Sequence, residues 1–162
     1  MKTPTDPQLF KESDQLSAWR LFLHTYRRVL DRLEDELRGE RGLSLTWYDV
    51  LIQLYKAPEY RLRMNDLAGS ILLSKSGLTR LIDRMEKAGL VERASCPSDR
   101  RGWFAVLTPR GEEVFKEAAP VHLDGIARHF TNHLSPTEAR TLIEAFEKIL
   151  EAQGRAAPKA SL

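Results

Sequence analysis

Polar and basic side chains are spaced so that they share one face of a helix predicted between Ser74 and Gly89. At 100° per residue, the members of this face are Ser76, Thr79, Arg80, Asp83, Arg84 and Lys87. On the opposite face, the spacing i, i+3, i+4 and i+7 predicts a buried stripe of Leu78, Leu81, Ile82 and Met85. Ser74 is suited to cap this helix by accepting a backbone N–H hydrogen bond. Such a helix presents a mainly cationic face to a partner outside the fold.

The segment after this helix has the pattern of a β-hairpin with a basic tip. Two strand-like runs, 91–95 and 103–107, are joined by residues 96–102, in which proline and glycine supply turn chemistry. Asp99, Arg100 and Arg101 place charge at the tip. A helix about 10–12 Å across fits the DNA major groove, ~12 Å wide, and hairpin arginines can reach phosphates or the minor groove. The sequence therefore predicts a DNA-binding winged helix.

The distribution of charge agrees with this prediction. The chain of 162 residues carries a formal net charge of only +2. Residues 61–110, however, contain ten basic and five acidic side chains, a local net charge of +5. Concentrated positive charge is the electrostatic feature expected of a surface that binds a phosphate backbone.

A long amphipathic helix is predicted to begin at Ser13 or Asp14 and to end near Gly39 and Gly42. Its apolar positions alternate between spacings of three and four, at Leu16, Trp19, Leu23, Tyr26, Leu30, Leu33 and Leu37. A helix of roughly 25 residues would be ~37 Å long. One compact domain of this size does not cover such a helix, so a partner subunit is expected to pack against it.

Local signals place the elements between the long helix and the hairpin. Thr46 is expected to cap a helix that ends at Pro58. Alternation over 60–64 predicts a short strand that can pair with the hairpin, and Asn65 or Asp66 is expected to cap a brief helix over 67–72. This is the element order of a winged helix-turn-helix.

Two further helices are predicted after the hairpin. Thr108 and Pro109 open the first, which Pro120 is expected to kink. A capping box of Ser135 and Glu138 opens the second.

The predicted fold class is mainly α (α+β), a winged helix-turn-helix with a three-stranded wing sheet and long N- and C-terminal dimerisation helices. The expected divisions are a flexible N-terminus (1–12), a dimerisation helix (13–45), a DNA-binding domain (46–110), C-terminal dimerisation helices (111–153) and a disordered tail (154–162). No apolar run reaches the ~20 residues of a membrane span, and the first residues are too polar for a signal peptide. With a single cysteine, the chain is expected to be soluble and cytoplasmic.

The chain resembles the MarR family of bacterial transcription regulators over roughly residues 13–153. The resemblance lies in LTRLIDRMEKAGLVER (78–93), in Asp99-x-Arg101 followed by Leu107, Thr108 and Gly111, and in the flanking long helices. It implies a homodimer whose two reading helices, one α-helix from each subunit laid in the major groove, meet half-sites ~34 Å apart on a near-palindromic operator. From the short apolar runs, no membrane association is expected. It also implies repression that is relieved by a small aromatic or anionic effector.

The resemblance implies particular roles for residues in the helix and hairpin. Lys75, Ser76, Thr79, Arg80 and Arg84 occupy positions that touch bases or phosphates in family members. Arg100 and Arg101 are implied to act at the wing, with Asp99 holding one of them. Together with Ser74 at the helix start, these residues form the predicted DNA site.

Other side chains have both a functional and a packing interpretation. Trp19, Trp47, Tyr48 and Asp49 are candidates to line an effector crevice, since aromatic walls with few charges suit a planar anion; alternatively, they pack in the core or dimer interface. His122, His129 and His133 are expected on one side of a continuous helix. His129 and His133 are weak metal candidates with no acid evident nearby, so interface or surface packing is the favoured interpretation.

Cys96 is expected in the exposed wing loop as an incidental thiol, with oxidant sensing as the alternative. No catalytic motif is present, so the chain is not expected to be an enzyme or to need a cofactor. Two other functions are compatible with the pattern, a winged-helix protein-interaction module and a small-molecule-binding helical dimer.

Overall fold

The computed structural model describes residues 13–71, 75–96 and 99–154. The helices are α1 (Asp14–Arg41), α2 (Leu45–Lys56), α3 (Met64–Ser70), α4 (Lys75–Lys87), α5 (Pro109–His129) and α6 (Pro136–Ala152). The strands are β1 (Arg61–Arg63), β2 (Val91–Cys96) and β3 (Asp99–Leu107), and short 3-10 turns η2 (Pro58–Tyr60) and η3 (Thr131–His133) complete the chain. The predicted flexible N-terminus (1–12) and nearly all of the predicted tail lie outside the described residues.

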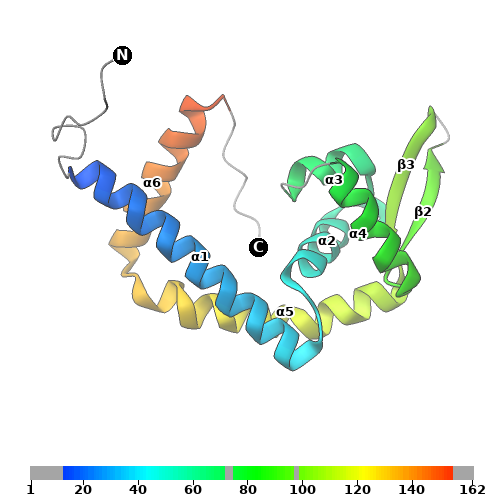
Figure 1. Cartoon of the computed structure of the whole chain (residues 1–162), viewed down its shortest axis with the longest axis horizontal. Helices are drawn as coiled ribbons and strands as arrows, with labels where there is room; N and C mark the ends of the chain where they lie inside the picture. Colours follow the sequence, from blue (N-terminus) through cyan, green and yellow to red (C-terminus); the bar gives the residue numbers. More distant parts are fainter. Residues whose placement is uncertain (1–12, 72–74, 97–98, 155–162) are drawn as a thin grey trace, which may run out of the picture.

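Two groups of elements are connected by the long helix α5 (Figure 1). Helix α1 crosses α5 and lies beside α6. These two helices and the C-terminal part of α5 form one arm of the molecule. Helices α2, α3 and α4 form a lobe with the sheet at the other end. The arrangement confirms the predicted mainly helical winged fold, and separates the surface of α4 from the N-terminal half of α1.

Helix α1 begins and ends close to the predicted residues, and local capping determines both ends. The Ser13 hydroxyl accepts a hydrogen bond from the backbone N–H of Leu16, and Gly42 ends the helix in the left-handed region, with φ of 63°. Gly39 lies inside the helix and does not mark its end. Among the described residues, α1 is buried only near its C-terminal end, at Leu33 and Leu37.

The sheet is antiparallel, with strand order β1-β3-β2. It has the three predicted members, but the hairpin is longer than expected because β3 begins at Asp99. A shift in register between Ser95 and Cys96 distorts the end of β2. Cys96 is only 5% exposed, so the prediction of an exposed thiol in the wing loop is wrong.

Two predicted helix starts are also wrong. Helix α2 is capped by Ser44, whose hydroxyl accepts a hydrogen bond from the Trp47 N–H, and not by Thr46. The carboxylate of Glu34 in α1 accepts a hydrogen bond from the Leu45 N–H, which stabilises the earlier start. Helix α3 begins directly after β1, with Arg63 at its N-cap and no side-chain cap. Pairing of β1 with β3 therefore sets this boundary.

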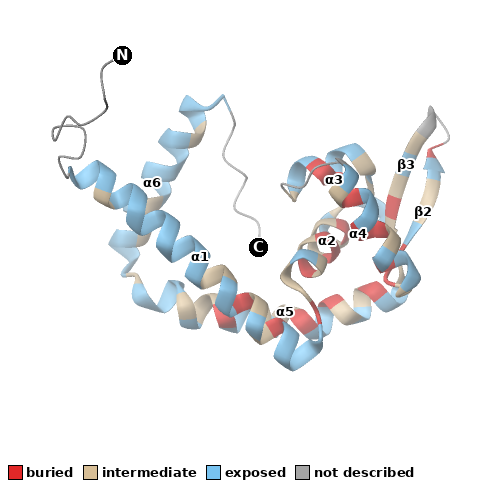
Figure 2. Ribbon diagram, in the orientation of Figure 1, coloured by how far each residue is buried: buried red, intermediate tan, exposed pale blue. Residues whose placement is uncertain are grey.

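The core lies in the lobe and continues along α5 to the end of α1 (Figure 2). It includes all four residues of the predicted stripe on α4, and Ile82 and Met85 have no exposed surface. By contrast, α6 contains no buried residue. Large apolar side chains remain exposed on the first half of α1 and on α6.

Helix α5 begins where predicted, with the Thr108 hydroxyl accepting a hydrogen bond from the Gly111 N–H, and it continues through Pro120. It ends at His129, and His133 belongs to the following 3-10 turn. The three histidines therefore do not share one continuous helix. The capping box of Ser135 and Glu138 on α6 is confirmed. Within the described ranges, no helix combines the length and apolar character needed to span a membrane.

Candidate nucleic-acid interface

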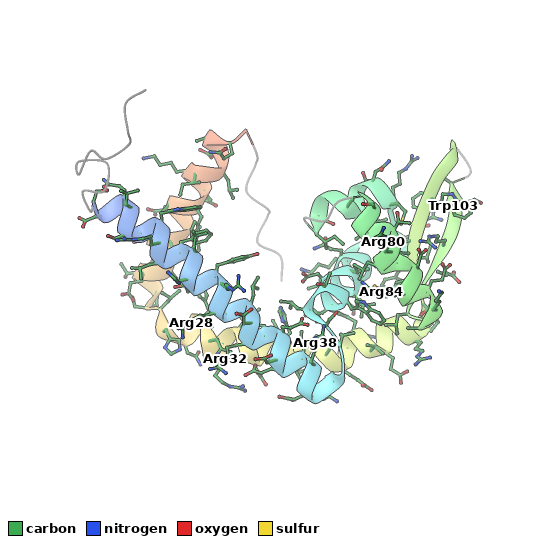
Figure 3. The ribbon with its side chains drawn as sticks, in the orientation of Figure 1. Arg28, Arg32, Arg38, Arg80, Arg84 and Trp103 are labelled. Atoms are coloured by element: carbon green, nitrogen blue, oxygen red, sulfur yellow. The ribbon has the colours of Figure 1, made fainter. Side chains whose placement is uncertain are left out.

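The outward face of α4 carries exposed polar and cationic side chains beside the wing. Ser76, Thr79, Arg80 and Arg84 are exposed on this helix, and Figure 3 shows Arg80 and Arg84 on α4 near the sheet. Because the stripe of Leu78, Leu81, Ile82 and Met85 anchors the opposite face in the core, these polar positions point away from the lobe.

Other predicted DNA-site residues are described only in part. Ser74 lies outside the described residues. The backbone of Lys75 begins α4, and the backbones of Asp99, Arg100 and Arg101 begin β3. The side chains of these four residues are not among those described.

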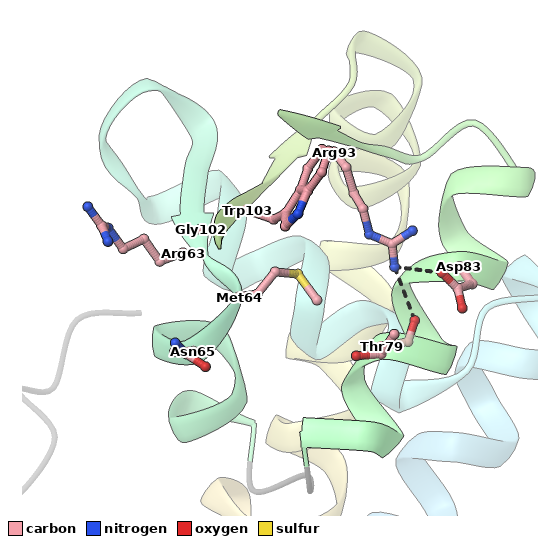
Figure 4. Close-up of a pocket in the computed structure, with 8 residues that line it drawn as sticks. All are labelled: Arg63, Met64, Asn65, Thr79, Asp83, Arg93, Gly102 and Trp103. Carbon is pink, nitrogen blue, oxygen red and sulfur yellow. Dashed lines mark hydrogen bonds and ion pairs between the residues drawn. The ribbon is translucent and has the colours of Figure 1, made fainter. Parts of the chain in front are cut away.

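A hollow of about 540 Å³ lies between α4, the wing and the start of α3. Its lining consists of Arg63, Met64, Asn65, Thr79, Asp83, Arg93, Gly102 and Trp103 (Figure 4). Trp103 is 50% exposed on β3. Arg63, Asn65, Arg93 and Trp103 were not among the sequence candidates, because only the pairing of β1 and β2 with β3 brings them beside α4.

Arg93 joins strand β2 of the wing to helix α4. Its Nη2 atom lies 2.6 Å from Asp83 Oδ1, and its Nη1 atom lies 2.8 Å from Glu86 Oε2. Nη2 also donates to the backbone carbonyl of Thr79 at 3.3 Å, and the Arg93 backbone N–H donates to Glu86 Oε1 at 3.2 Å. Strand β2 is thus connected to one face of α4 at three positions, Thr79, Asp83 and Glu86.

Strand β1 contributes two more guanidinium groups. Arg61 and Arg63 lie 5.2 and 5.7 Å from the centroid of the Phe104 ring on β3, within the range of cation–π attraction. Arg61 also forms an ion pair with Glu59. Glu59 and Tyr60 both have φ of 55°, a conformation that non-glycine residues seldom adopt.

The base of the wing is fixed to the start of α5. The Thr108 hydroxyl donates to the Gly89 carbonyl at 2.7 Å, and the Thr108 N–H donates to the Leu90 carbonyl. Gly89 has φ of 73°, which allows the chain to leave α4 and enter β2. These bonds place α4 and the wing at a fixed position relative to α5.

The effector candidates fall into two separate places within this chain. Trp19 is exposed on α1 and packs on Phe22, whose ring lies 5.5 Å from that of Phe146 on α6. Tyr48, only 2% exposed, packs in the core against Phe115 and His122. Its α2 neighbours Trp47 and Asp49 are partly buried. The structure therefore does not bring Trp19 together with the other three.

Burial changes the acid–base properties of this part of α2. Desolvation, with a further contribution from the charge of Glu34, raises the pKa of Asp49 to about 6. Desolvation also raises the pKa of Tyr48 to about 12, and burial lowers that of His122. The ionised form of Asp49 is thus disfavoured in the fold.

Replacing Asp49 with asparagine is expected to stabilise the protein at pH 7 by up to about 3 kcal/mol. Below the pKa of Asp49 in the unfolded chain, the acid is neutral in both states and costs the fold no stability. As the pH rises from there through the folded pKa of about 6, ionisation is easier in the unfolded chain, so the fold loses stability. The gain for Asp49→Asn should therefore be largest above pH 7 and shrink towards pH 4.5. Urea unfolding of both proteins between pH 4.5 and 8 checks this, and a gain that does not vary with pH would contradict it.

His129 and His133 both have hydrogen-bond partners within the protein. His129 Nε2 lies 2.7 Å from Glu36 Oε1, and the same oxygen accepts a hydrogen bond from Arg128 at 2.6 Å. The His129 hydrogen bond is the main reason that the pKa of Glu36 is lowered. His133 contacts the Arg128 carbonyl. The expectation of no acid beside these histidines is wrong, yet in the described part of the chain no cluster of three or more His, Cys, Asp or Glu residues could hold a metal ion.

An exposed cationic helix packed beside the wing of a three-stranded sheet defines a winged-helix DNA-binding protein. A sequence profile of the MarR family matches residues 41–102. AbsC, a MarR family transcriptional regulator from Streptomyces coelicolor, is 40% identical, with coverage of 88% of this chain and 96% of that chain and a TM-score of 0.82. The chain belongs to the MarR family.

Two further relatives show the same relationship. Sco3205, a MarR family regulator of Streptomyces coelicolor solved in complex with DNA, is 31% identical over 94% of each chain, with a TM-score of 0.83. The transcriptional repressor MprA of Escherichia coli is 28% identical over 81% of this chain and 73% of its own length. The chain is therefore a DNA-binding transcriptional regulator and not an enzyme.

Proposed function

We propose that this regulator is a homodimeric repressor that binds a near-palindromic operator and is released by a small aromatic or anionic effector. The observation that carries the proposal is the division of the surface into two parts. One end presents the polar and cationic face of α4 beside the wing. The other presents an apolar surface of Leu16, Trp19, Leu21, Phe22, Leu23, Tyr26, Ile143, Phe146 and Ile149.

The rings of Phe22 and Phe146 lie 5.5 Å apart, so exposed apolar side chains of α1 and α6 adjoin; such a surface is rare on a monomer and typical of a subunit interface. We assign residues 13–45 and 111–153 to dimerisation and residues 46–110 to DNA binding. A two-fold axis through the α1 and α6 surfaces would present two α4 helices together, and half-sites one turn of DNA apart, ~34 Å, would match them. Repression is supported by the similarity to MprA, which is a transcriptional repressor.

On the DNA, the α4 helix would enter the major groove. Ser76, Thr79 and Arg80 would read base edges, whereas Lys75 and Arg84 would contact phosphates. Ser74 would begin the helix. At the wing, Arg100 and Arg101 would reach the backbone or minor groove, with Asp99 holding one of them.

Replacing Arg80 with alanine is expected to weaken binding by about 1–3 kcal/mol and to relax base preference, because a base contact is lost. Replacing Arg101 with alanine is expected to weaken binding to all sequences, and to reduce the slope of log affinity against log salt by about 1. Fluorescence anisotropy with operator and scrambled duplexes at several salt concentrations separates the two effects. Equal loss on both duplexes for Arg80→Ala would contradict its role in reading bases.

The effector would contact Trp47 and Asp49, which are partly buried on α2. Tyr48 would form the buried wall behind them, and Trp19 would lie at the dimer surface. An ionised Asp49 would accept a hydrogen bond from a phenol, and the neutral acid, which the raised pKa of Asp49 favours, would donate one to a carboxylate. The effector would act only through a difference in its affinity for the DNA-bound and free shapes of the dimer.

Three measurements test the proposal. Light scattering should give twice the chain mass of 18.5 kDa. Anisotropy should show salt-dependent binding to an inverted repeat from the neighbouring intergenic DNA, with one dimer per site. A thermal-shift screen of phenols and aromatic acids should identify a compound that also releases DNA. A monomer, or binding without preference for the inverted repeat, would overturn the proposal.

A further inference from the structure

The reading helix carries two acidic side chains on the side that adjoins the wing. Asp83 and Glu86 lie in the second half of α4, and their side chains are 47% and 39% exposed. Carboxylates at such a position repel the phosphates of approaching DNA. Their presence beside a surface that binds DNA therefore requires an explanation.

The guanidinium group of Arg93 forms ion pairs with both acids. Arg93 projects from β2 into the space between the wing and α4, and its side chain is only 22% exposed (Figure 4). Its two terminal nitrogens are directed to Asp83, Glu86 and the Thr79 carbonyl. Two carboxylates thus share one cation, and the nitrogens that would otherwise contact phosphate point into the protein.

The backbone strengthens this connection. The Arg93 N–H donates to Glu86 Oε1, so Glu86 receives both a main-chain and a side-chain hydrogen bond from the same residue. Because the guanidinium is planar, its nitrogens fix the direction as well as the distance of the carboxylates that they bind. A lysine at this position has no comparable geometry.

We infer that Arg93 is a positioning residue that holds the wing at a fixed angle to the reading helix and neutralises Asp83 and Glu86, and that it does not itself contact DNA. The inference rests on the proposed placement of α4 and the wing on DNA. Simultaneous contact of a helix with the major groove and a hairpin with the adjacent backbone requires a defined angle between them. Arg93 sets this angle before DNA is bound, which reduces the conformational entropy that the protein loses on binding.

The double variant Asp83→Asn/Glu86→Gln distinguishes this role from a direct contact. Removing two negative charges from a DNA-binding surface, and freeing Arg93 to reach phosphate, would tighten binding if charge alone mattered. We call the ion pairs of Arg93 with Asp83 and Glu86 the clamp. Loss of the clamp should instead weaken operator binding about tenfold. Unchanged or tighter binding in fluorescence anisotropy would overturn the inference.

Arg93→Lys is the matched conservative variant, since it retains the positive charge but lacks the planar pair of guanidinium nitrogens. It should lose about as much affinity as the double variant, whereas a phosphate contact would be largely retained by lysine. Thermal unfolding should change little in both variants, because partly exposed ion pairs contribute little stability. Affinity retained in Arg93→Lys would count against the positioning role.

Hydrogen exchange of the DNA-free protein gives a reading that does not depend on the proposed DNA placement. In the double variant, the amides of β2 near Arg93 should exchange faster, while those of α1 and α5 remain unchanged. Faster exchange together with normal operator affinity would show that the clamp exists but does not serve DNA binding, and would overturn the inference. Absence of operator binding by the unaltered protein would instead overturn the proposed function.

Discussion

A variant with glutamate at both Ile143 and Ile149 is expected to be monomeric and to lose tight operator binding. These side chains are 55% and 56% exposed on α6, so their replacement leaves the core of one subunit intact. In the proposed dimer they become buried, and burying an unpaired carboxylate costs several kcal/mol. Two carboxylates from each subunit should therefore raise the dimer dissociation constant by about a thousandfold or more.

Analytical ultracentrifugation measures the dimer, and anisotropy measures operator binding at the same concentrations. Thr141→Glu is a control because it adds one such carboxylate at an exposed position of the same helix, and it should remain dimeric. Far-ultraviolet circular dichroism should show that helical content is retained in both variants. A dimer that survives both glutamates would place the subunit interface elsewhere.

Replacing Gly111 with alanine is expected to destabilise the fold by about 3 kcal/mol. A Cβ atom at this position would lie 2.0 Å from the Leu90 carbonyl oxygen and 2.8 Å from Leu107 Cδ1. The first of these is a backbone atom that also accepts a hydrogen bond from Thr108. The start of α5 and the base of the wing would have to separate, so operator affinity should fall as well.

Gly39→Ala is the control for this variant. Gly39 lies inside α1, and in the described part of the chain an added Cβ would have no atom within 4 Å apart from the adjacent residues and backbone of its own helix. Alanine should therefore stabilise the helix by about 0.5–1 kcal/mol. Urea unfolding at one fixed protein concentration compares the two, since dimer stability depends on concentration. A loss for Gly111→Ala no larger than a few tenths of a kcal/mol would mean that the wing base adjusts without strain.

Features that depend on neighbours in the chain could be predicted from the sequence. The four-residue stripe of α4 is buried as predicted, because helical period follows from backbone geometry alone. The start of α1 next to Ser13 and the capping box at Ser135 are also confirmed, since each start is stabilised by a hydrogen bond between residues only three apart. Thr46 was the wrong cap for α2 because Glu34, eleven residues before Leu45, stabilises a start after Ser44.

Features that depend on distant residues were decided only by the tertiary structure. The burial of Cys96 follows from the irregular pairing of β2 with β3. The contact of Glu36 with His129 joins positions 93 residues apart, and no periodicity in either helix indicates it. The sequence by itself determined which helix face is cationic, because that depends only on the order of side chains along α4. The packing of β2 against α4 decided that Arg93 faces Asp83 and Glu86, because ion pairs between elements form only where the fold brings opposite charges together.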